Sequence, residues 1–417
     1  MKFLLFLIGA AIAAAQPRYD ILLKGGHVID AKNGINEVRD VAIAGNRIAA
    51  GAADIPAAQA RLVVDVSSLY VTPGLIDMHV HVFAGTMGRD FVGERSIRPD
   101  GFTFRSGVTT VVDAGSSGWR NFTEFKAQII DRSQTRVLAM LNIVGHGMGG
   151  RSDVEQNTGD MEPERTAEVA RQFKDIIVGV KTAHFAGREW TAVDRAVEAG
   201  RLAGVPVMID FGTFHPERPY QELVLKKLRP GDISTHTFLR LSPMLDENRR
   251  LQPFLLEAQK RGVRFDVGHG SGSFSFPQAV PAMQQGFLPD TISTDLHVSS
   301  MNVGMKDMLN VMSKFLAIGM ALDAVVARAT WAPAQVVHHE ELGHLSPDAV
   351  ADVTVLRLQK GDFGFVDSGG LRMRGTSKLV GELTIRDGKV VWDLNGITRP
   401  AWDAAASRRP SSSRPVG

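Results

Sequence analysis

Short apolar runs separated by turn residues occupy both ends of the chain. Between positions 16 and 72, and again between 346 and 400, such runs alternate with Gly and Asn turns, which is typical of a β-meander. Asp387-Gly388 is a strong hairpin signal in the second stretch. Because the two stretches flank a long middle segment, we expect them to form one small β-sandwich domain built from both termini.

The middle segment, 73–345, alternates apolar runs with stretches of helical periodicity. The apolar runs are continuous, which indicates strands buried on both faces. The stretches between them, such as 164–177 and 193–203, have the Ala, Glu and Arg content of amphipathic helices. The pattern predicts an α/β fold, a (β/α)8 TIM barrel. The expected strands are 74–81, 109–113, 137–143, 176–181, 205–210, 232–238, 264–268 and 291–295.

The two extremities fall outside this pattern. The apolar run 3–15 follows Lys2 and ends in small residues, as in a secretory signal peptide, so we expect 1–15 to be removed and the protein to be periplasmic or secreted. The run is short for a membrane span, which takes about 20 apolar residues, and we expect no span in the mature chain. An uncleaved anchor or a misplaced start is the alternative. The Ser-, Arg- and Pro-rich segment 401–417 is expected to be disordered.

The amino-acid composition excludes several classes of binding and catalytic site. Lys and Arg number 47 against 45 Asp and Glu, a balance that argues against a nucleic-acid-binding protein. Cysteine is absent, which excludes disulfides, thiolate zinc sites, iron–sulfur clusters and cysteine nucleophiles. Histidine occurs 12 times. Metal chemistry would therefore use histidine, carboxylates or a less common ligand.

Polar residues end several of the expected strands, on the side where such barrels carry their chemistry. His79 and His81 lie two positions apart, so both face one side and could hold a metal ion. His236 ends the sixth run and is a third candidate ligand. Asp295 ends the eighth run; it could bind a metal and accept a proton from a metal-activated water. A helix N-cap is the alternative role for this aspartate.

Lys181 ends the fourth run, where a buried amine is costly unless it is paired or neutral. Burial depresses the pKa of a lysine and leaves it nucleophilic. Such an amine can take up carbon dioxide to form a carbamate, an anion able to bridge two metals. A salt-bridged lysine and a Schiff-base lysine are the alternatives.

Together these segments resemble the amidohydrolase superfamily of metal-dependent hydrolases, and more narrowly its dihydroorotase-like amidohydrolase/deacetylase group. The resemblance covers nearly the whole chain after the first 15 residues. The matching segments are VTPGLIDMHVH at 71–81, GVTTVVDAG at 107–115, VGVK at 178–181, PGDISTH at 230–236, STD at 293–295, ARATWAPA at 327–334 and GHL at 343–345.

The resemblance implies a centre of two divalent metal ions, usually Zn²⁺. It implies that His79, His81 and Asp295 bind one ion and that His236 binds the other, with carboxylated Lys181 bridging them. The family usually supplies a further histidine from the fifth strand, where this chain has Asp210.

Asp210 is therefore the main departure from the family pattern. A carboxylate can still bind zinc through oxygen, and it would favour harder ions such as Mn²⁺. His184 or His215 could instead take the vacant ligand position, or the site could hold a single ion.

The expected reaction is hydrolysis of an amide or ester bond of a small molecule, such as an N-acyl or O-acetyl group, by metal-activated hydroxide. Asp295 would carry the proton to the leaving group. Candidate substrate-binding residues are His146, Arg151, His184 and His269. A cyclic-amide hydrolase of dihydroorotase type and a catalytically silent metal-bearing binding protein are the alternatives. The sequence is compatible with a homo-oligomer.

Overall fold

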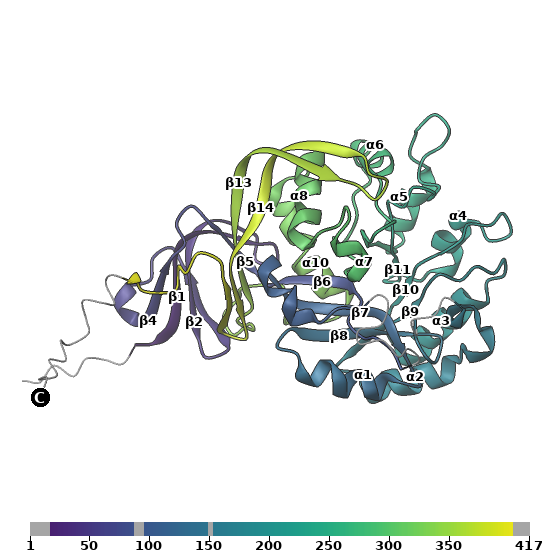
Figure 1. Cartoon of the computed structure of the whole chain (residues 1–417), viewed down its shortest axis with the longest axis horizontal. Coiled ribbons are helices and arrows are strands. Elements are labelled where there is room, and N and C mark those ends of the chain that lie inside the picture. Colours follow the sequence, from purple (N-terminus) through teal and green to yellow (C-terminus); the bar gives the residue numbers. More distant parts are fainter. Residues whose placement is uncertain (1–16, 87–95, 149–152, 403–417) are drawn as a thin grey trace, which may run out of the picture.

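The computed structural model describes residues 17–86, 96–148 and 153–402 (Figure 1). The expected signal peptide and Arg151 lie outside the described residues. So does the expected C-terminal tail, apart from Ala401 and Trp402. The described residues form two β-sheets with helices around the second (Figure 1). Within these ranges, each helix is too short or too polar to cross a lipid bilayer.

The first sheet combines strands from both ends of the chain. Its order is β15-β14-β13-β5-β1-β2-β3, and β4 pairs with β1. The link is β5, where Val71 pairs with Val28 on one side and with Val355 on the other. This confirms a β-sandwich domain from both termini. The strands are β1 (Tyr19–Asp30), β2 (Ile35–Ala44), β3 (Arg47–Ala52), β4 (Ala60–Asp65), β5 (Tyr70–Pro73), β13 (Val353–Val366), β14 (Arg372–Arg386) and β15 (Lys389–Asp393).

The second sheet is parallel and runs in chain order, which confirms the TIM barrel. Its strands are β6 (Leu75–Val80), β7 (Val108–Gly118), β8 (Arg136–Asn142), β9 (Ile177–Thr182), β10 (Val207–Ile209), β11 (Ile233–Ser234) and β12 (Arg264–Phe265). The eighth expected strand is not a regular strand; single parallel bridges join Thr291 to Asp266 and Leu296, the residue after it, to Val80. These bridges connect β12 to β6 and close the ring.

Helices cover the outside of the barrel. In α3, buried Ala192, Ala196 and Ala199 recur at helical spacing on the inner face. The helices are α1 (Phe122–Gln128), α2 (Pro163–Gln172), α3 (Thr191–Ala203), α4 (Tyr220–Glu222), α5 (Pro253–Lys260), α6 (Phe276–Gln284), α7 (Val298–Met301), α8 (Met308–Ile318), α9 (Leu322–Ala327) and α10 (Trp331–Val336). Short 3₁₀ turns occupy Ala57–Gln59, Pro99–Gly101, Phe104–Ser106, Ile130–Arg132, Val154–Gln156 and Thr158–Asp160, and a π turn occupies Leu223–Lys227.

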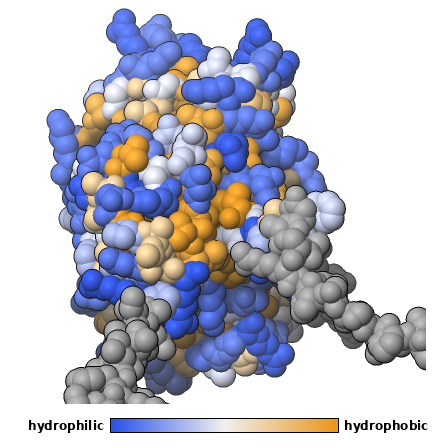
Figure 2. Space-filling view, turned by 90° about the vertical axis from the view of Figure 1, so that its left-hand side faces the viewer, coloured by the Kyte–Doolittle hydropathy of each residue, from blue (hydrophilic) through white to orange (hydrophobic). Residues whose placement is uncertain are grey.

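The hairpin of β13 and β14 joins the two domains, because it arches from the sandwich over α8 towards α6 (Figure 1). Along its length, Leu379 N donates to Ser313 Oγ at 3.0 Å. At its tip, Phe276 N donates to Asp367 Oδ2, also at 3.0 Å. The outer part of the hairpin therefore packs on the barrel. Figure 2 shows the opposite, sandwich end of the molecule, where apolar surface lies among hydrophilic side chains.

Candidate active site

A pocket of about 320 Å³ opens among the carboxyl ends of the parallel strands. Side chains at the ends of β6, β9, β10 and β11 and of the segment 291–295 line it, because the chain leaves the sheet there and turns into a loop. The pocket brings together all of the residues expected as metal ligands: His79, His81, Lys181, Asp210, His236 and Asp295.

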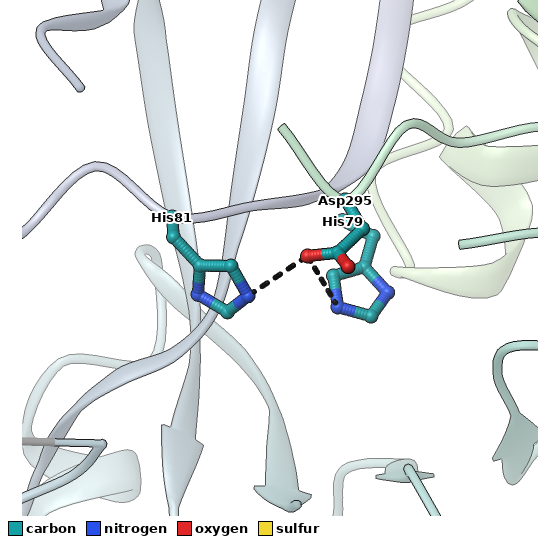
Figure 3. A group of neighbouring side chains, drawn as sticks. All are labelled: His79, His81 and Asp295. Carbon is teal, nitrogen blue, oxygen red and sulfur yellow. Dashed lines mark ion pairs between the residues drawn. The ribbon is translucent and has the colours of Figure 1, made fainter. Parts of the chain in front are cut away.

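His79, His81 and Asp295, which line the pocket, form a compact group (Figure 3). Oδ1 of Asp295 lies 3.1 Å from Nε2 of His81 and 3.7 Å from Nε2 of His79. Within the described ranges, this is the one trio of His and acidic residues whose ligand atoms all lie within 4.8 Å of one another. Two imidazole nitrogens and a carboxylate oxygen are a donor set that suits Zn²⁺.

The far nitrogen of each imidazole is held by a hydroxyl group. Nδ1 of His79 lies 3.0 Å from Thr235 Oγ1, and Nδ1 of His81 lies 3.0 Å from Ser116 Oγ. These contacts occupy Nδ1 and leave Nε2 directed at Asp295, which is the arrangement expected of metal-binding histidines. The residues present therefore fit a divalent cation.

Asp266 is a buried carboxylate that supports this group and that the sequence analysis did not single out. It accepts hydrogen bonds from Thr235 Oγ1 at 2.8 Å, Thr291 Oγ1 at 2.7 Å and Ser293 Oγ at 2.7 Å. Its Oδ2 also lies 3.6 Å from Nδ1 of His79. The signal in the sequence was a charged residue inside the apolar run 264–268, since buried charges are rare unless paired.

Burial sets the charge state of this group. Burial, together with nearby Lys181, lowers the pKa of His79 to about 3. The imidazole of His79 is therefore neutral, which is the form that binds a metal. Burial alone would raise the pKa of Asp295, but His79 and His81 hold it well below its usual range. Asp295 is therefore an anion.

Lys181 reaches the same group from β9, and only 1% of its surface is exposed. Its Nζ lies 3.1 Å from Nε2 of His79 and 3.6 Å from Sδ of Met208, neither of which carries a negative charge. Because Oδ1 of Asp295 is 3.7 Å from the same imidazole nitrogen, the amine and the carboxylate are at most about 6.8 Å apart. Gly115 makes room for this lysine, since a Cβ there would lie 2.7 Å from Lys181 Cγ.

The pKa of Lys181 is lowered by its burial, although Asp210 and Asp295 act in the opposite direction. A neutral amine in this position is the form that reacts with an electrophile.

Several site residues have a strained backbone. His184, His236 and Asp295 have φ angles of 52°, 57° and 50°, a region that residues with a Cβ rarely adopt. Such strain is concentrated at functional sites, where the surrounding structure holds it. Gly268 allows a close approach, because a Cβ there would lie 2.8 Å from Nδ1 of His236. A Cβ on Gly270 would lie even closer to Oδ2 of Asp295.

Asp210 lies near two further histidines of the pocket, His184 and His236. Its Oδ1 accepts a hydrogen bond from Gly212 N at 3.0 Å. Its Oδ2 lies 3.4 Å from Nε2 of His184 and 3.6 Å from Nε2 of His236. Burial would raise the pKa of Asp210, but His236 and His184 hold it well below its usual range.

His184 is held on its other side by Glu155, a second residue that the sequence analysis missed. Nδ1 of His184 lies 2.9 Å from Oε2 of Glu155. Burial would lower the pKa of His184, but Asp210 and Glu155 raise it to about 9. Glu155 is only 4% exposed and follows no strand, so no pattern in the sequence pointed to it.

The other expected substrate-binding residues do not line the pocket in the described part of the chain. His269 is fully buried, because its ring stacks on Phe274 with centroids 4.7 Å apart and its Nε2 lies 2.6 Å from Nζ of Lys314. His146 is half-buried, and its carbonyl accepts from Asn121. Arg151 lies outside the described residues. His297 does line the pocket, 3.8 Å from Asp295.

Comparisons with known proteins agree with this geometry. No protein-family model matches the chain. A deacetylase of Brucella anthropi is 36% identical over 314 residues, which cover 74% of this chain and 76% of the relative. A deacetylase of Agrobacterium fabrum is 35% identical over 339 residues, covering 79% and 81%.

Solved structures resemble the whole architecture. The crystal structure of an adenine deaminase has a TM-score of 0.82 at 28% identity and covers 90% of this chain and all of its own (100%). That of a dihydroorotase has a TM-score of 0.78 at 31% identity and covers 89% and 99%. The chain therefore belongs to the amidohydrolase superfamily and is a deacetylase-like enzyme with a buried His–His–Asp metal site.

Proposed function

We propose that this enzyme is a binuclear metallohydrolase that removes an acyl group, such as acetyl, from the nitrogen or oxygen of a small molecule. The observation that carries the proposal is the meeting of Lys181 and Asp295 at Nε2 of His79, 3.1 and 3.7 Å away. A metal site and a candidate bridging group thus share one pocket. The two relatives named as deacetylases support the class of reaction.

His79, His81 and Asp295 would hold the first ion, and His236 would contribute to the second. Zn²⁺ suits these donors, and Mn²⁺ is the alternative that the carboxylate of Asp210 favours. Bound divalent ions supply Lewis acidity, which activates water and polarises a carbonyl group.

Lys181 would bridge the two ions as a carbamate. Its neutral amine attacks carbon dioxide, a new N–C bond forms, and one proton leaves to solvent, so that the neutral head becomes an anion. The burial of Lys181 and the uncharged neighbours of its Nζ favour the neutral amine that this step requires. The chain has no cysteine and therefore no thiolate ligand. The carbamate would turn a basic residue, Lys181, into an anionic ligand.

Asp295 is placed to move the proton. Its Oδ1 faces His79 and His81, whereas its Oδ2 lies on the side of His297, 3.8 Å from Nε2. One oxygen can therefore act as a ligand while the other accepts a proton from the attacking water and passes it to the leaving group.

The rest of the pocket suits a small polar substrate. Met148 and Leu239 offer limited apolar surface, while Ser271, Ser273 and Ser299 line the same space. A volume of about 320 Å³ is at the lower end of small-molecule sites. An acetylated metabolite would fit this volume.

A cyclic-amide hydrolase is the second candidate. The similarity of 89% of the chain to the solved dihydroorotase, with a TM-score of 0.78, favours it. Ring opening of a cyclic amide and deacylation both begin with attack of activated water on a carbonyl group.

Export to the periplasm or the exterior is also part of this proposal. It rests on the apolar run 3–15 after Lys2. N-terminal sequencing of the protein secreted or recovered from the periplasm should begin near Gln16. A mature chain that retains Met1 in the cytoplasm would contradict it.

Chelation and reloading test the proposed function. The enzyme is assayed on N-acetyl amino acids, acetyl esters, dihydroorotate and adenine, after removal of metal and again after addition of Zn²⁺ or Mn²⁺. We expect metal-dependent release of acetate from at least one acetylated compound. Turnover of dihydroorotate alone would favour the second candidate, and full activity after complete metal removal would contradict both.

A further inference from the structure

We infer that His184, from the loop after β9, supplies the second ion with the histidine that the fifth strand lacks, so that His184, Asp210 and His236 form the second cation site. The inference rests on the proposed binuclear function and concerns which residues build that site. Asp210, which stands where the family usually has a histidine, would then be one ligand of a set that differs from the usual one.

The orientation of Asp210 is the first observation. Gly212 N donates to Oδ1 at 3.0 Å, which fixes the carboxylate plane. Its Oδ2 is then directed between the Nε2 atoms of His184 and His236, at 3.4 and 3.6 Å. Two imidazole nitrogens thus approach the same carboxylate oxygen in the pocket.

Both imidazoles are oriented by a partner on the opposite side of the ring. Nδ1 of His184 donates to Oε2 of Glu155 at 2.9 Å, and Nδ1 of His236 donates to the carbonyl oxygen of Gly268 at 2.6 Å. Carboxylate and carbonyl partners of this kind fix the tautomer that presents Nε2 to a metal. His79 and His81 show the same pattern with hydroxyl partners.

The spacing also suits a cation. Two ligands about 2.1 Å from a tetrahedral ion are about 3.4 Å apart, whereas a hydrogen bond between nitrogen and oxygen is typically about 2.7–3.2 Å. The distances from Asp210 to His184 and His236, 3.4 and 3.6 Å, match the first value. The group is looser than His79, His81 and Asp295, so binding would draw the His184 ring towards Asp210.

The loops that carry His184 and Asp210 are built as one unit. A Cβ on Gly212 would lie 3.1 Å from Cα of His184, so the two loops pack directly against each other. Buried Arg218 ties them together, because its Nη2 donates to the carbonyl of Phe185 at 3.0 Å and to that of Thr213 at 2.7 Å. The backbone of His184 is therefore held beside the pocket, despite its position outside any strand.

The test is the metal content and metal affinity of the full-length protein, not its activity alone. Wild type, His184→Ala, Glu155→Gln and the control His215→Ala are loaded with Zn²⁺, dialysed and analysed by mass spectrometry. Affinity for the weaker ion is measured by competition with a chelator. His215 is a matched control, because it lies on the neighbouring loop, its Nε2 donates to the carbonyl of Ala186 at 3.0 Å, and it does not line the pocket.

We expect two ions per chain in wild type and in His215→Ala, and one ion in His184→Ala. Glu155→Gln should keep both ions but bind the weaker one about 10- to 100-fold less tightly, the usual cost of losing an orienting partner. The double variant His184→Ala/Asp210→His should regain the second ion, because it restores a histidine to the fifth strand. Circular dichroism shows whether each variant is folded.

Two ions in folded His184→Ala, bound as tightly as in wild type, would overturn the inference while leaving the binuclear function intact. One ion in both proteins would overturn the inference and the binuclear centre, but not the metal dependence. A wild-type protein that binds no metal would overturn the proposed function itself, so the failures are distinguishable.

Discussion

Nζ of Lys181 lies 3.1 Å from Nε2 of His79, and each residue is only 1% exposed. A cationic ammonium could not donate to a nitrogen that binds a metal, and burial in any case lowers the pKa of this lysine. With an ion bound at Nε2 of His79, the lysine head would therefore have to be neutral or converted to an anion. That conversion is the step on which the proposed binuclear centre depends.

Replacing Asp295 should abolish most of the catalysis. Asp295→Asn keeps the shape of the side chain but removes the proton acceptor at Oδ2, so we expect kcat to fall about 10²- to 10⁴-fold. Kinetics at saturating Zn²⁺, with the metal content measured in the same sample, check this. A variant with both full metal content and wild-type kcat would show that Asp295 does not carry the proton.

Asp266 should strengthen metal binding by orienting His79. Asp266→Asn weakens the anchor of Thr235 and His79, so we expect about 10- to 100-fold weaker metal binding. Chelator competition measures this. Asp290→Asn is the matched control, because Asp290 accepts from Phe265 N at 2.9 Å and pairs with Arg264 rather than with Thr235 or His79. Equal metal affinity in the two variants would argue against this role.

Lys314 should make stability depend on pH. Burial lowers its pKa from 10.5 to about 7; Lys306 acts in the same direction, and Asp367 and Asp307 oppose it. Between these pH values the unfolded chain binds more protons than the folded one, so this group makes the protein more stable as pH rises, by up to about 1.4 kcal/mol per pH unit. Lys314→Met should flatten that rise.

Urea unfolding of Lys314→Met at several pH values between about 7 and 10 measures this slope. The exposed Lys360 provides a control variant, Lys360→Met, which should keep the wild-type slope. A slope in Lys314→Met equal to that of wild type would mean that Lys314 is charged in the folded protein throughout this range.

Asp367 should anchor the tip of the β13–β14 hairpin to the barrel. It is 2% exposed and accepts from Phe276 N at 3.0 Å and from Leu371 N at 2.8 Å. Asp367→Ala leaves these donors without their partner, which should cost about 1–3 kcal/mol of unfolding free energy. Asp362→Ala, which removes an exposed pair with Arg374 on the same hairpin, should cost less than about 1 kcal/mol. Similar losses in chemical denaturation would contradict the anchoring role.

Much of this site could be predicted because the ends of buried strands can be recognised from the sequence. A polar residue that closes a continuous apolar run in a parallel barrel must lie at one rim, and this logic brings Lys181, Asp210 and His236 into one pocket. The eighth run departs from a regular strand, yet its bridges to Asp266 and Val80 still deliver Asp295 to the same place.

What the sequence could not reveal depends on side-chain direction and on contacts between distant loops. His269 follows a strand just as His236 does, but stacking on Phe274 and the contact with Lys314, 45 residues away, keep it out of the pocket. Glu155 comes from a loop with no periodicity, so only the fold shows that it meets His184.

The metal content of Lys181→Ala tests the central claim most directly. With Lys314→Met as a control for loss of a buried lysine outside the pocket, both proteins are loaded with Zn²⁺ in the presence of bicarbonate and analysed by mass spectrometry. The account predicts two ions in wild type and in Lys314→Met, but at most one in Lys181→Ala, with hydrolysis lost. Two ions and unchanged hydrolysis in Lys181→Ala would contradict the carbamate bridge.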